Sequence, residues 1–420
     1  MSLLDDRKTW QRLYKDVKEI PLPSAVTGFN VSLDRIIPVT PDLIRSPALA
    51  RTDMAGLTSR LLESMRTCTA DEWFVSDRLL YDRITRLFAD TGSLVIGGQA
   101  GIAACSLAQL GAEEVFCLAP GAGSVTCSRL RDAGVIPLTF CSNRPGVPDT
   151  VHHVFEYRPG IVPVDEGVVP RSNRFIASPV HGPETVLLPG GETGGLIKRL
   201  SGCTRAFLSG YQYLTTDVQY RKAAGQIREL KGCNNDMRVH IECVTVSEPV
   251  VLDGMLRHIF PAADSIGMNE RELAILVSYI RDPGTGRNGY AMLPPSGLVD
   301  GAVEVWRETG VRRVHVHTFG CHILVSEKQG AEPEGSLLSL LFASRVVSRA
   351  AEGKSRTVSP HGMAILEETG HRYRNEGMPG VFSSEDCTVT VVPACIAEKP
   401  EKTCGLGDIL SSAAFVADRF

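Results

Sequence analysis

Short apolar runs that alternate with helix-like segments constrain the fold of this chain more than any other feature. Each run has the length of a buried strand, and a segment with helical character follows it. The pairs are "SLVIGG" (93–98) with "QAGIAACSLAQLGA" (99–112), "RAFLSG" (205–210) with "DVQYRKAAGQIREL" (217–230), and "RVHIECV" (238–244) with "VLDGMLRHIF" (251–260), and the pattern continues in "DSIGMNERELAILVSYI" (264–280) and "VRRVHVHTF" (311–319). This alternation is typical of a parallel sheet covered on both faces. The sequence therefore predicts an α/β fold, with ligands at the carboxyl ends of the strands.

Two stretches interrupt this alternation. One is an irregular, proline-containing segment with a helix at 35–75, and the other, at 138–182, reads as the alternating strands "VHHVFEY" and "RSNRFIASPV". Alternation suits a half-exposed sheet. We expect a small lid domain from residues 35–75 and 138–182, and a large doubly wound domain from residues 1–34, 76–137 and 183–420. Ordinary surface hairpins are the alternative.

Charge and composition exclude several classes of protein. The formal net charge is -4, and no long run of Lys or Arg is present, which argues against binding to nucleic acid or to an acidic membrane surface. No stretch approaches the about 18 apolar residues that a membrane helix requires. Twelve scattered cysteines without a C-x-x-C pair or a signal peptide favour reduced thiols and a cytoplasmic protein.

The stretch "TCGLGDILSS" (403–412) places a carboxylate beside a pair of glycines. Gly405 and Gly407 would let backbone N–H groups approach an anion, and Asp408 could accept a proton. A turn with an Asp N-cap is the alternative, and short glycine motifs often occur by chance.

Two further motifs carry acids near strand ends. In "VHIECV", His240 and Glu242 share one face of a strand, so that a metal ion or a paired cation would satisfy the carboxylate. In "DSIGMNERELA", Asn269 and Glu272 are three residues apart at the start of a helix. They could hold a hydrated Mg²⁺, or they could form a capping box.

Polar residues at other strand ends suit a polyhydroxy ligand. They are Gly98 and Gln99 in "VIGGQAGIAA", and Asn30 and Asp34 in "GFNVSLDRII". For the first motif, the alternative is tight packing of a strand against a helix. For the second, it is a strand followed by a turn. In the lid segment, Arg158, Arg171 and Arg174 offer guanidinium groups to phosphate oxygens, although exposed arginines are common.

In this order, the motifs GFN…D, GGQAG, HH..EY, NRF, HIE, N-x-x-E and GLGD resemble those of the ADP-dependent sugar kinases of the ribokinase superfamily, which include ADP-dependent glucokinases and phosphofructokinases. The resemblance extends from Gly28 to Ser412. It implies a ribokinase-like fold, with a large doubly wound α/β domain and a smaller discontinuous lid. It also implies a glycolytic enzyme that transfers the β-phosphoryl group of ADP to a sugar and releases AMP.

The resemblance assigns roles at the phosphoryl-transfer site. Asp408 would be the general base, and the amides from Gly405 through Gly407 to Asp408 would form the anion hole. Mg²⁺ would be held largely through water, and ADP would be bound by residues from the three stretches NRF, VHVHTFG and GLGD. The implied metal residues are Glu242, Glu272 and Asn269, and the implied nucleotide residues are Arg174, Val314, His317, Thr318, Gly320 and Gly407.

The resemblance also assigns sugar-binding roles. These residues are Asn30, Asp34, Gly98, Gln99 and His152. Glu72 in "CTADEWF" falls where the family associates a glutamate with glucose, and Arg158 and Arg171 are candidates for the 6-phosphate of fructose 6-phosphate. We therefore expect a bifunctional phosphofructokinase and glucokinase that is a monomer or a small homo-oligomer.

Three positions depart from the family pattern. Ile409 replaces a common threonine after GLGD, Ser32 replaces an asparagine in GFNxNxD, and Cys68 replaces a glycine. Two alternatives stay open: an ATP-dependent kinase of the wider superfamily that acts on a nucleoside or another sugar, and a catalytically silent protein that binds sugar or nucleotide.

Overall fold

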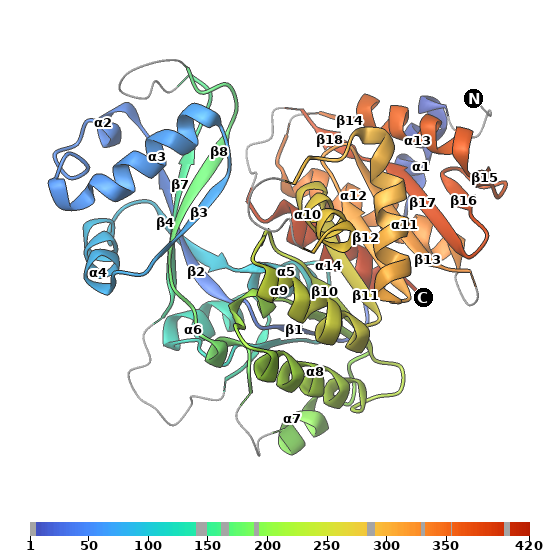
Figure 1. Ribbon diagram of the computed structural model, residues 1–420, viewed down its shortest axis with the longest axis horizontal. Coiled ribbons are helices and arrows are strands. Elements are labelled where there is room, and N and C mark those ends of the chain that lie inside the picture. The colour runs from blue at the N-terminus through green and yellow to red at the C-terminus, as the bar shows by residue number, and fades with distance from the viewer. Residues whose placement is uncertain are drawn as a thin grey trace.

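Two β-sheets organise the chain, one of eleven strands and one of five (Figure 1). The computed structural model describes residues 6–139, 149–160, 168–188, 193–283, 290–328, 332–353, 355–398 and 404–420. Of the predicted lid segment 138–182, residues 140–148 and 161–167 therefore lie outside the described residues.

The large sheet is parallel through most of its width. In spatial order its parallel strands are β6 (Ile136–Leu138), β5 (Val115–Leu118), β1 (Ala25–Gly28), β9 (Arg205–Leu208), β10 (Arg238–Glu242), β11 (Ser265–Asn269) and β12 (Arg313–His317). Antiparallel strands extend it through β13 (Cys321–Glu327), β17 (Cys387–Pro393), β16 (Val381–Ser383) and β15 (Arg374–Asn375). Near-continuous apolar strands such as β1 and β9 are buried on both faces, as the alternation predicted.

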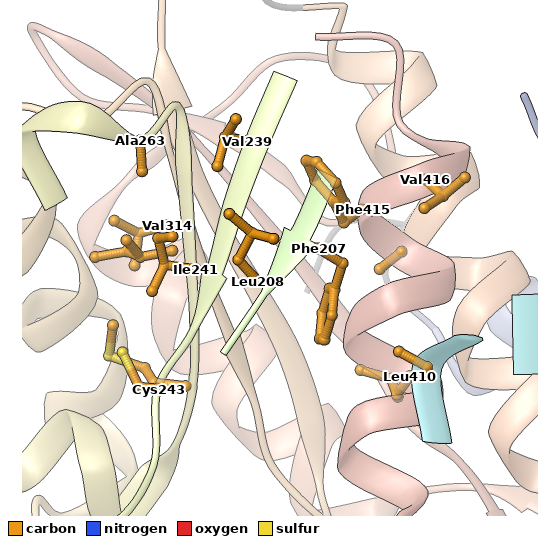
Figure 2. Close-up of a cluster of buried hydrophobic side chains, with 14 of the residues drawn as sticks. Phe207, Leu208, Val239, Ile241, Cys243, Ala263, Val314, Leu410, Phe415 and Val416 are labelled. Carbon is orange, nitrogen blue, oxygen red and sulfur yellow. The ribbon is translucent and has the colours of Figure 1, made fainter. Parts of the chain in front are cut away.

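Helices cover the large sheet, and the hydrophobic core lies between these helices and the strands. Helix α14 (Leu406–Ala417) packs against α5 (Gln99–Gln109), α12 (Pro333–Ala350) and the strands β9, β10 and β12. Figure 2 shows the packing, with Phe415 of α14 facing Phe207 of β9. The other helices are α1 (Arg7–Asp16), α6 (Ser124–Asp132), α7 (Thr193–Leu200), α8 (Asp217–Lys231), α9 (Pro249–Gly254), α10 (Glu270–Arg281), α11 (Leu298–Thr309) and α13 (Pro360–Arg372), and β14 (Arg356–Val358) pairs with β18 (Cys395–Ala397).

The small sheet has its own core. Its order is β3 (Asp71–Val75), β8 (Asn173–Pro179), β7 (Val151–Tyr157), β2 (Ser32–Pro38) and β4 (Ser93–Gly97). Short helix α2 (Pro41–Ile44) and helices α3 (Ala55–Thr67) and α4 (Arg78–Leu87) accompany it, and residues such as Leu57, Ile84 and Phe155 are buried in a separate cluster.

The structure corrects one sequence prediction here. Strand β4, the apolar run "SLVIG", belongs to the small sheet, where it pairs antiparallel with β2. Its burial alternates along the strand because it lies at an edge, whereas a strand of the large sheet is buried on both faces. Helix α4 also contributes Ile84 to the small core. The boundaries at residues 34 and 76 were therefore misplaced, since β2 and the segment 78–97 lie with the small sheet.

No helix among the described residues is long and apolar enough to span a membrane. The cysteines that the structure describes are free thiols, and most of them are buried.

Candidate functional site

The N-terminus of α14 offers free backbone amides to an anion. Gly405 precedes the helix with φ at 70°, a conformation that favours glycine, and no side chain in the described part of the chain caps the helix. A Cβ on Gly405 would come within 2.9 Å of Ile102, and one on Gly407 within 3.1 Å of the His317 ring. The glycines thus bring backbone N–H groups and the positive end of the helix to the first turn, where Asp408 also lies.

Asp408 is a half-buried carboxyl group among other charges. Burial raises its pKa to about 7, the negative charge of Glu242 adds to the shift, and His317 and Arg174 oppose it. A carboxyl group with a pKa near neutrality is well suited to accept a proton from a substrate.

Glu242, at the end of β10, is held by three donors. Its Oε2 accepts hydrogen bonds from His240 Nε2 at 3.0 Å and from Ser411 Oγ at 2.6 Å, and its Oε1 accepts one from His317 Nε2 at 2.8 Å. Burial favours the neutral acid, but the hydrogen bonds from the two histidines outweigh it and lower the pKa of Glu242 to about 2. Burial likewise opposes protonation of His317, yet Glu242 raises its pKa to about 9. The two residues therefore form a buried ion pair beside Asp408.

Asn269 and Glu272 form the capping box at the start of α10. The Asn269 side chain accepts from the backbone N–H groups of Arg271 and Glu272, at 2.9 and 3.0 Å, and Glu272 Oε2 accepts from Asn269 N at 2.9 Å. Thr245 donates to Glu272 Oε1 at 3.2 Å. Burial raises the pKa of Glu272 to about 7. The capping alternative is therefore confirmed, and it leaves the Asn269 amide oxygen without a free lone pair for a metal.

The carboxylates suit a Mg²⁺ ion held through water better than one bound directly. No cluster of three or more His, Cys, Asp or Glu among the described residues is arranged to ligate a metal. Glu242 and Glu272 nevertheless line one cavity of about 30 Å³, which is large enough for ordered water. Magnesium readily keeps several of its waters. Glu242 Oε1 and the two Glu272 oxygens each accept one hydrogen bond and so retain acceptor capacity for such waters.

A second polar cluster lies at the junction of the two sheets. Asp34 of β2 accepts from Ser32 Oγ at 3.0 Å, and its Oδ1 lies 3.8 Å from Nδ1 of His152 in β7. Burial raises the pKa of Asp34 to about 7, and the charge of Glu72 contributes. Glu72 of β3 accepts a hydrogen bond from Ser178 Oγ. The predicted sugar residues Asp34, Glu72 and His152 are thus brought together.

Asn30, Gly98 and Gln99 adjoin this cluster. The Asn30 carbonyl accepts from the amides of Ala100 and Gly101, and Gly98 has φ at 72° with this carbonyl 2.4 Å from where a Cβ would lie. Gln99 Nε2 donates to Cys243 O at 2.8 Å, whereas Gln99 Oε1 is buried without a partner among the described residues. A buried acceptor without a donor is suited to a ligand hydroxyl.

Arg174 of β8 connects the two clusters electrostatically. Burial raises the pKa values of Asp34, Glu72 and Asp408, and the positive charge of Arg174 partly offsets the effect at all three. The acid at the start of α14 and the acids of the small sheet therefore share one cation.

Other predicted residues lie elsewhere. Val314 is fully buried in the core of the large sheet (Figure 2), so its assignment to the nucleotide site was wrong. Thr318 Oγ1 accepts from the amides of Gly320 and Cys321 and so stabilises a turn. Arg158 and Arg171 are exposed.

Sequence reasoning missed three residues of the site. His181 Nε2 lies 3.0 Å from His152 Nε2, the His181 ring packs on Tyr213 with centroids 4.5 Å apart, and Ser411 binds Glu242. His181 and Tyr213 stand in "SPVHGPE" and "GYQYLT", which lack a recognisable motif. Ser411, one helical turn after Asp408, could have been found from the spacing.

Comparison with known proteins shows the family to which the chain belongs. The family model for the ADP-specific phosphofructokinase/glucokinase conserved region matches residues 49–417. One relative is an ADP-dependent glucose/glucosamine kinase of Pyrococcus furiosus, 24% identical over 98% of each chain. Another is an ADP-specific phosphofructokinase of Methanosarcina acetivorans, 25% identical over 77% of this chain and 75% of the relative.

Solved structures share the fold. An ADP-dependent kinase in complex with fructose-6-phosphate and ADPβS superposes with a TM-score of 0.77 at 24% identity, over 99% of this chain and 98% of the other. A hypothetical ADP-dependent phosphofructokinase from Pyrococcus horikoshii gives a TM-score of 0.74 at 21% identity, over 95% and 98%. The predicted fold class is confirmed.

Proposed function

Because the chain belongs to the ADP-specific phosphofructokinase and glucokinase family, we propose that it transfers the β-phosphoryl group of ADP to a hydroxyl of glucose or fructose 6-phosphate, releasing AMP. One observation carries this proposal: Asp408 lies at an uncapped helix N-terminus, with Glu242 and Asp34 near enough to perturb its pKa. A base, an anion-binding helix end and a polar sugar cluster thus adjoin one another.

The chemistry follows from these groups. The sugar hydroxyl forms a bond to the β-phosphorus, the bond from that phosphorus to the bridging oxygen breaks, and AMP leaves with that oxygen. The hydroxyl proton passes to Asp408 as the new bond forms. The amides of Gly405 to Asp408 meet the negative charge on the phosphoryl oxygens, and they need no reorientation to do so.

Residues around the first turn of α14 would position the donor. Arg174 and the protonated His317 supply positive charge toward the phosphates, and the turn at Thr318 and Gly320 would lie against the nucleotide. When bound, Mg²⁺ would neutralise charge on the phosphoryl oxygens, and Glu242 and Glu272 would hold it through water.

The sugar would lie between Asn30, Asp34, Gly98, Gln99 and His152. Asp34 accepts hydrogen bonds, and the unpartnered Gln99 Oε1 offers a further acceptor. Glu72 suits a hydroxyl of glucose, while Arg158 and Arg171 would bind the 6-phosphate of fructose 6-phosphate. The enzyme would act in the cytoplasm as a monomer or small homo-oligomer.

Initial rates with ADP and with ATP, each against glucose and fructose 6-phosphate, test the proposal. We expect turnover with ADP and Mg²⁺ on at least one of the sugars. Turnover with ATP alone would favour the wider superfamily alternative, and binding of ADP without turnover would favour a silent protein.

A further inference from the structure

Two histidines from different segments share a single hydrogen bond beside the acid of the sugar cluster. His152 Nε2 and His181 Nε2 are 3.0 Å apart, and on its other side His152 Nδ1 is 3.8 Å from Asp34 Oδ1. Burial lowers the pKa of both histidines to about 4, so both are neutral near pH 7. A neutral imidazole carries one donor and one acceptor nitrogen. Protonation of one Nε2 therefore excludes protonation of the other.

Asp34 favours one of the two ways in which this histidine pair can place its protons. Its Oδ1 is an acceptor oxygen, since it accepts from Ser32 Oγ at 3.0 Å, and it is also the oxygen nearest to His152 Nδ1. If His152 carries its proton on Nδ1, an N–H faces this oxygen; in the other tautomer a lone pair faces it and repels it. In the favoured arrangement, His152 is therefore protonated on Nδ1 and accepts a hydrogen bond at Nε2. His181 Nε2 is the donor of that bond.

The surroundings of His181 hold it in place for this role. His181 follows β8 of the small sheet, and its ring packs on Tyr213, which follows β9 of the large sheet. The Tyr213 hydroxyl donates to Asn30 Oδ1 at 3.4 Å. Among the described residues, His181 Nδ1 has no hydrogen-bond partner, so in this tautomer it offers a free acceptor.

We propose that His181 is a positioning residue of the sugar site, which donates its Nε2–H to His152 and so, together with Asp34, fixes the tautomer of His152. The inference rests on the proposed function for its kinetic consequence, since His152 and Asp34 are sugar residues there. Its structural content, the tautomer of His152, is independent of turnover.

The kinetic test compares three variants of the full chain. Gln places a donor nitrogen near the position of His181 Nε2, whereas Asn is one methylene shorter and Ala has no donor. We expect His181→Ala and His181→Asn to raise the KM for the sugar about tenfold or more, the scale of one lost buried hydrogen bond. The KM for ADP should stay within about twofold, and His181→Gln should restore most of the sugar affinity.

Control variants separate this role from general packing. His258 pairs with Asp217 at 2.6 Å, outside the sugar cluster, so His258→Ala should leave both KM values unchanged. Tyr213→Phe keeps the ring under His181 and removes the hydroxyl that donates to Asn30, so the tautomer of His152 should persist.

Nitrogen-15 spectra of the histidine rings test the tautomer directly, with His152→Gln used for assignment. We expect His152 to carry its proton on Nδ1 in the wild type and to show a smaller excess of this tautomer in His181→Ala, where Asp34 alone still favours it. A wild-type His152 protonated on Nε2, or a His181→Ala sugar KM within about twofold of wild type, would overturn the inference. If the wild type phosphorylates neither sugar, the proposed function fails, while the spectra still decide the tautomer.

Discussion

At the scale of single residues, Asp408 is the group on which the proposed chemistry depends most. Asparagine has nearly the same shape but cannot accept the proton. We therefore expect Asp408→Asn to lower kcat by about 10²–10⁴-fold while ADP binding is kept. Steady-state rates and calorimetric titration with ADP measure the two quantities. A variant with at least half of the wild-type kcat would show that Asp408 is not the base.

The pKa of Asp408 predicts a pH dependence. Burial raises this pKa to about 7, and a base must be ionised to act, so kcat/KM should fall as the pH drops below about 7. Bound Mg²⁺ favours the ionised form of Asp408, so the fall in kcat/KM should move to lower pH as the Mg²⁺ concentration increases. A profile that is flat from pH 5 to 8 would contradict this assignment.

The same raised pKa predicts an effect on stability. The unfolded chain releases the Asp408 proton near the ordinary pKa and the folded chain only near 7, so stability due to this group is lost as the pH rises between these values. Asp408→Asn should therefore be more stable than wild type at pH 8, by about 1–2 kcal/mol after solvent screening, and equally stable near pH 4. Urea unfolding at both pH values measures the difference, and a variant less stable at pH 8 would contradict it.

Glu272 has two roles that one substitution can separate. Glutamine also completes a capping box, so Glu272→Gln should keep the start of α10 and its stability. It removes a negative charge, so we expect the Mg²⁺ concentration for half-maximal rate to rise about fivefold or more, as for residues around other metal sites. An unchanged Mg²⁺ titration would show that Glu272 only caps the helix and does not hold Mg²⁺.

At the scale of elements, the start of α14 depends on a glycine in the left-handed region. Gly405→Ala would place a Cβ 2.9 Å from Ile102 at φ of 70°, so it should cost about 1–2 kcal/mol and also lower kcat by displacing the anion-binding amides. Gly225 in α8 is a matched control, because its Cβ would have no neighbour within 4 Å. Gly225→Ala should be neutral or stabilising in thermal unfolding, with kcat unchanged. Equal effects of the two substitutions would contradict this role for Gly405.

Periodicity identified most of the elements but not the sheet to which each belongs. The run "RVHIECV" was correctly predicted as a buried strand: β10 is buried on both faces, with Val239 and Ile241 on one and the polar His240 and Glu242 on the other. The run "SLVIGG" is likewise short and followed by a helix-like segment, yet β4 pairs with β2 at an edge of the small sheet. Pairing partners are chosen by contacts distant in sequence, which local pattern does not encode.

At the scale of the whole molecule, the site draws its residues from segments hundreds of residues apart. Asp34, Glu242 and Asp408 were predicted because each stands in a motif of the family. His181 and Tyr213 were not, since only the folding of β8 beside the loop after β9 brings their rings together. For Asn269 the sequence offered both a metal site and a capping box, and only the structure decides for the cap; it also shows that Val314 lies in the core.

The central claim is that this site moves a phosphoryl group from ADP to a sugar through Asp408. Phosphorus-31 spectra of ADP, Mg²⁺ and glucose or fructose 6-phosphate with the enzyme test it most directly. We predict that AMP and the new sugar phosphate ester appear in equal amounts with wild type, and that both are almost absent with Asp408→Asn. Inorganic phosphate in place of the ester, or products formed only from ATP, would contradict the account.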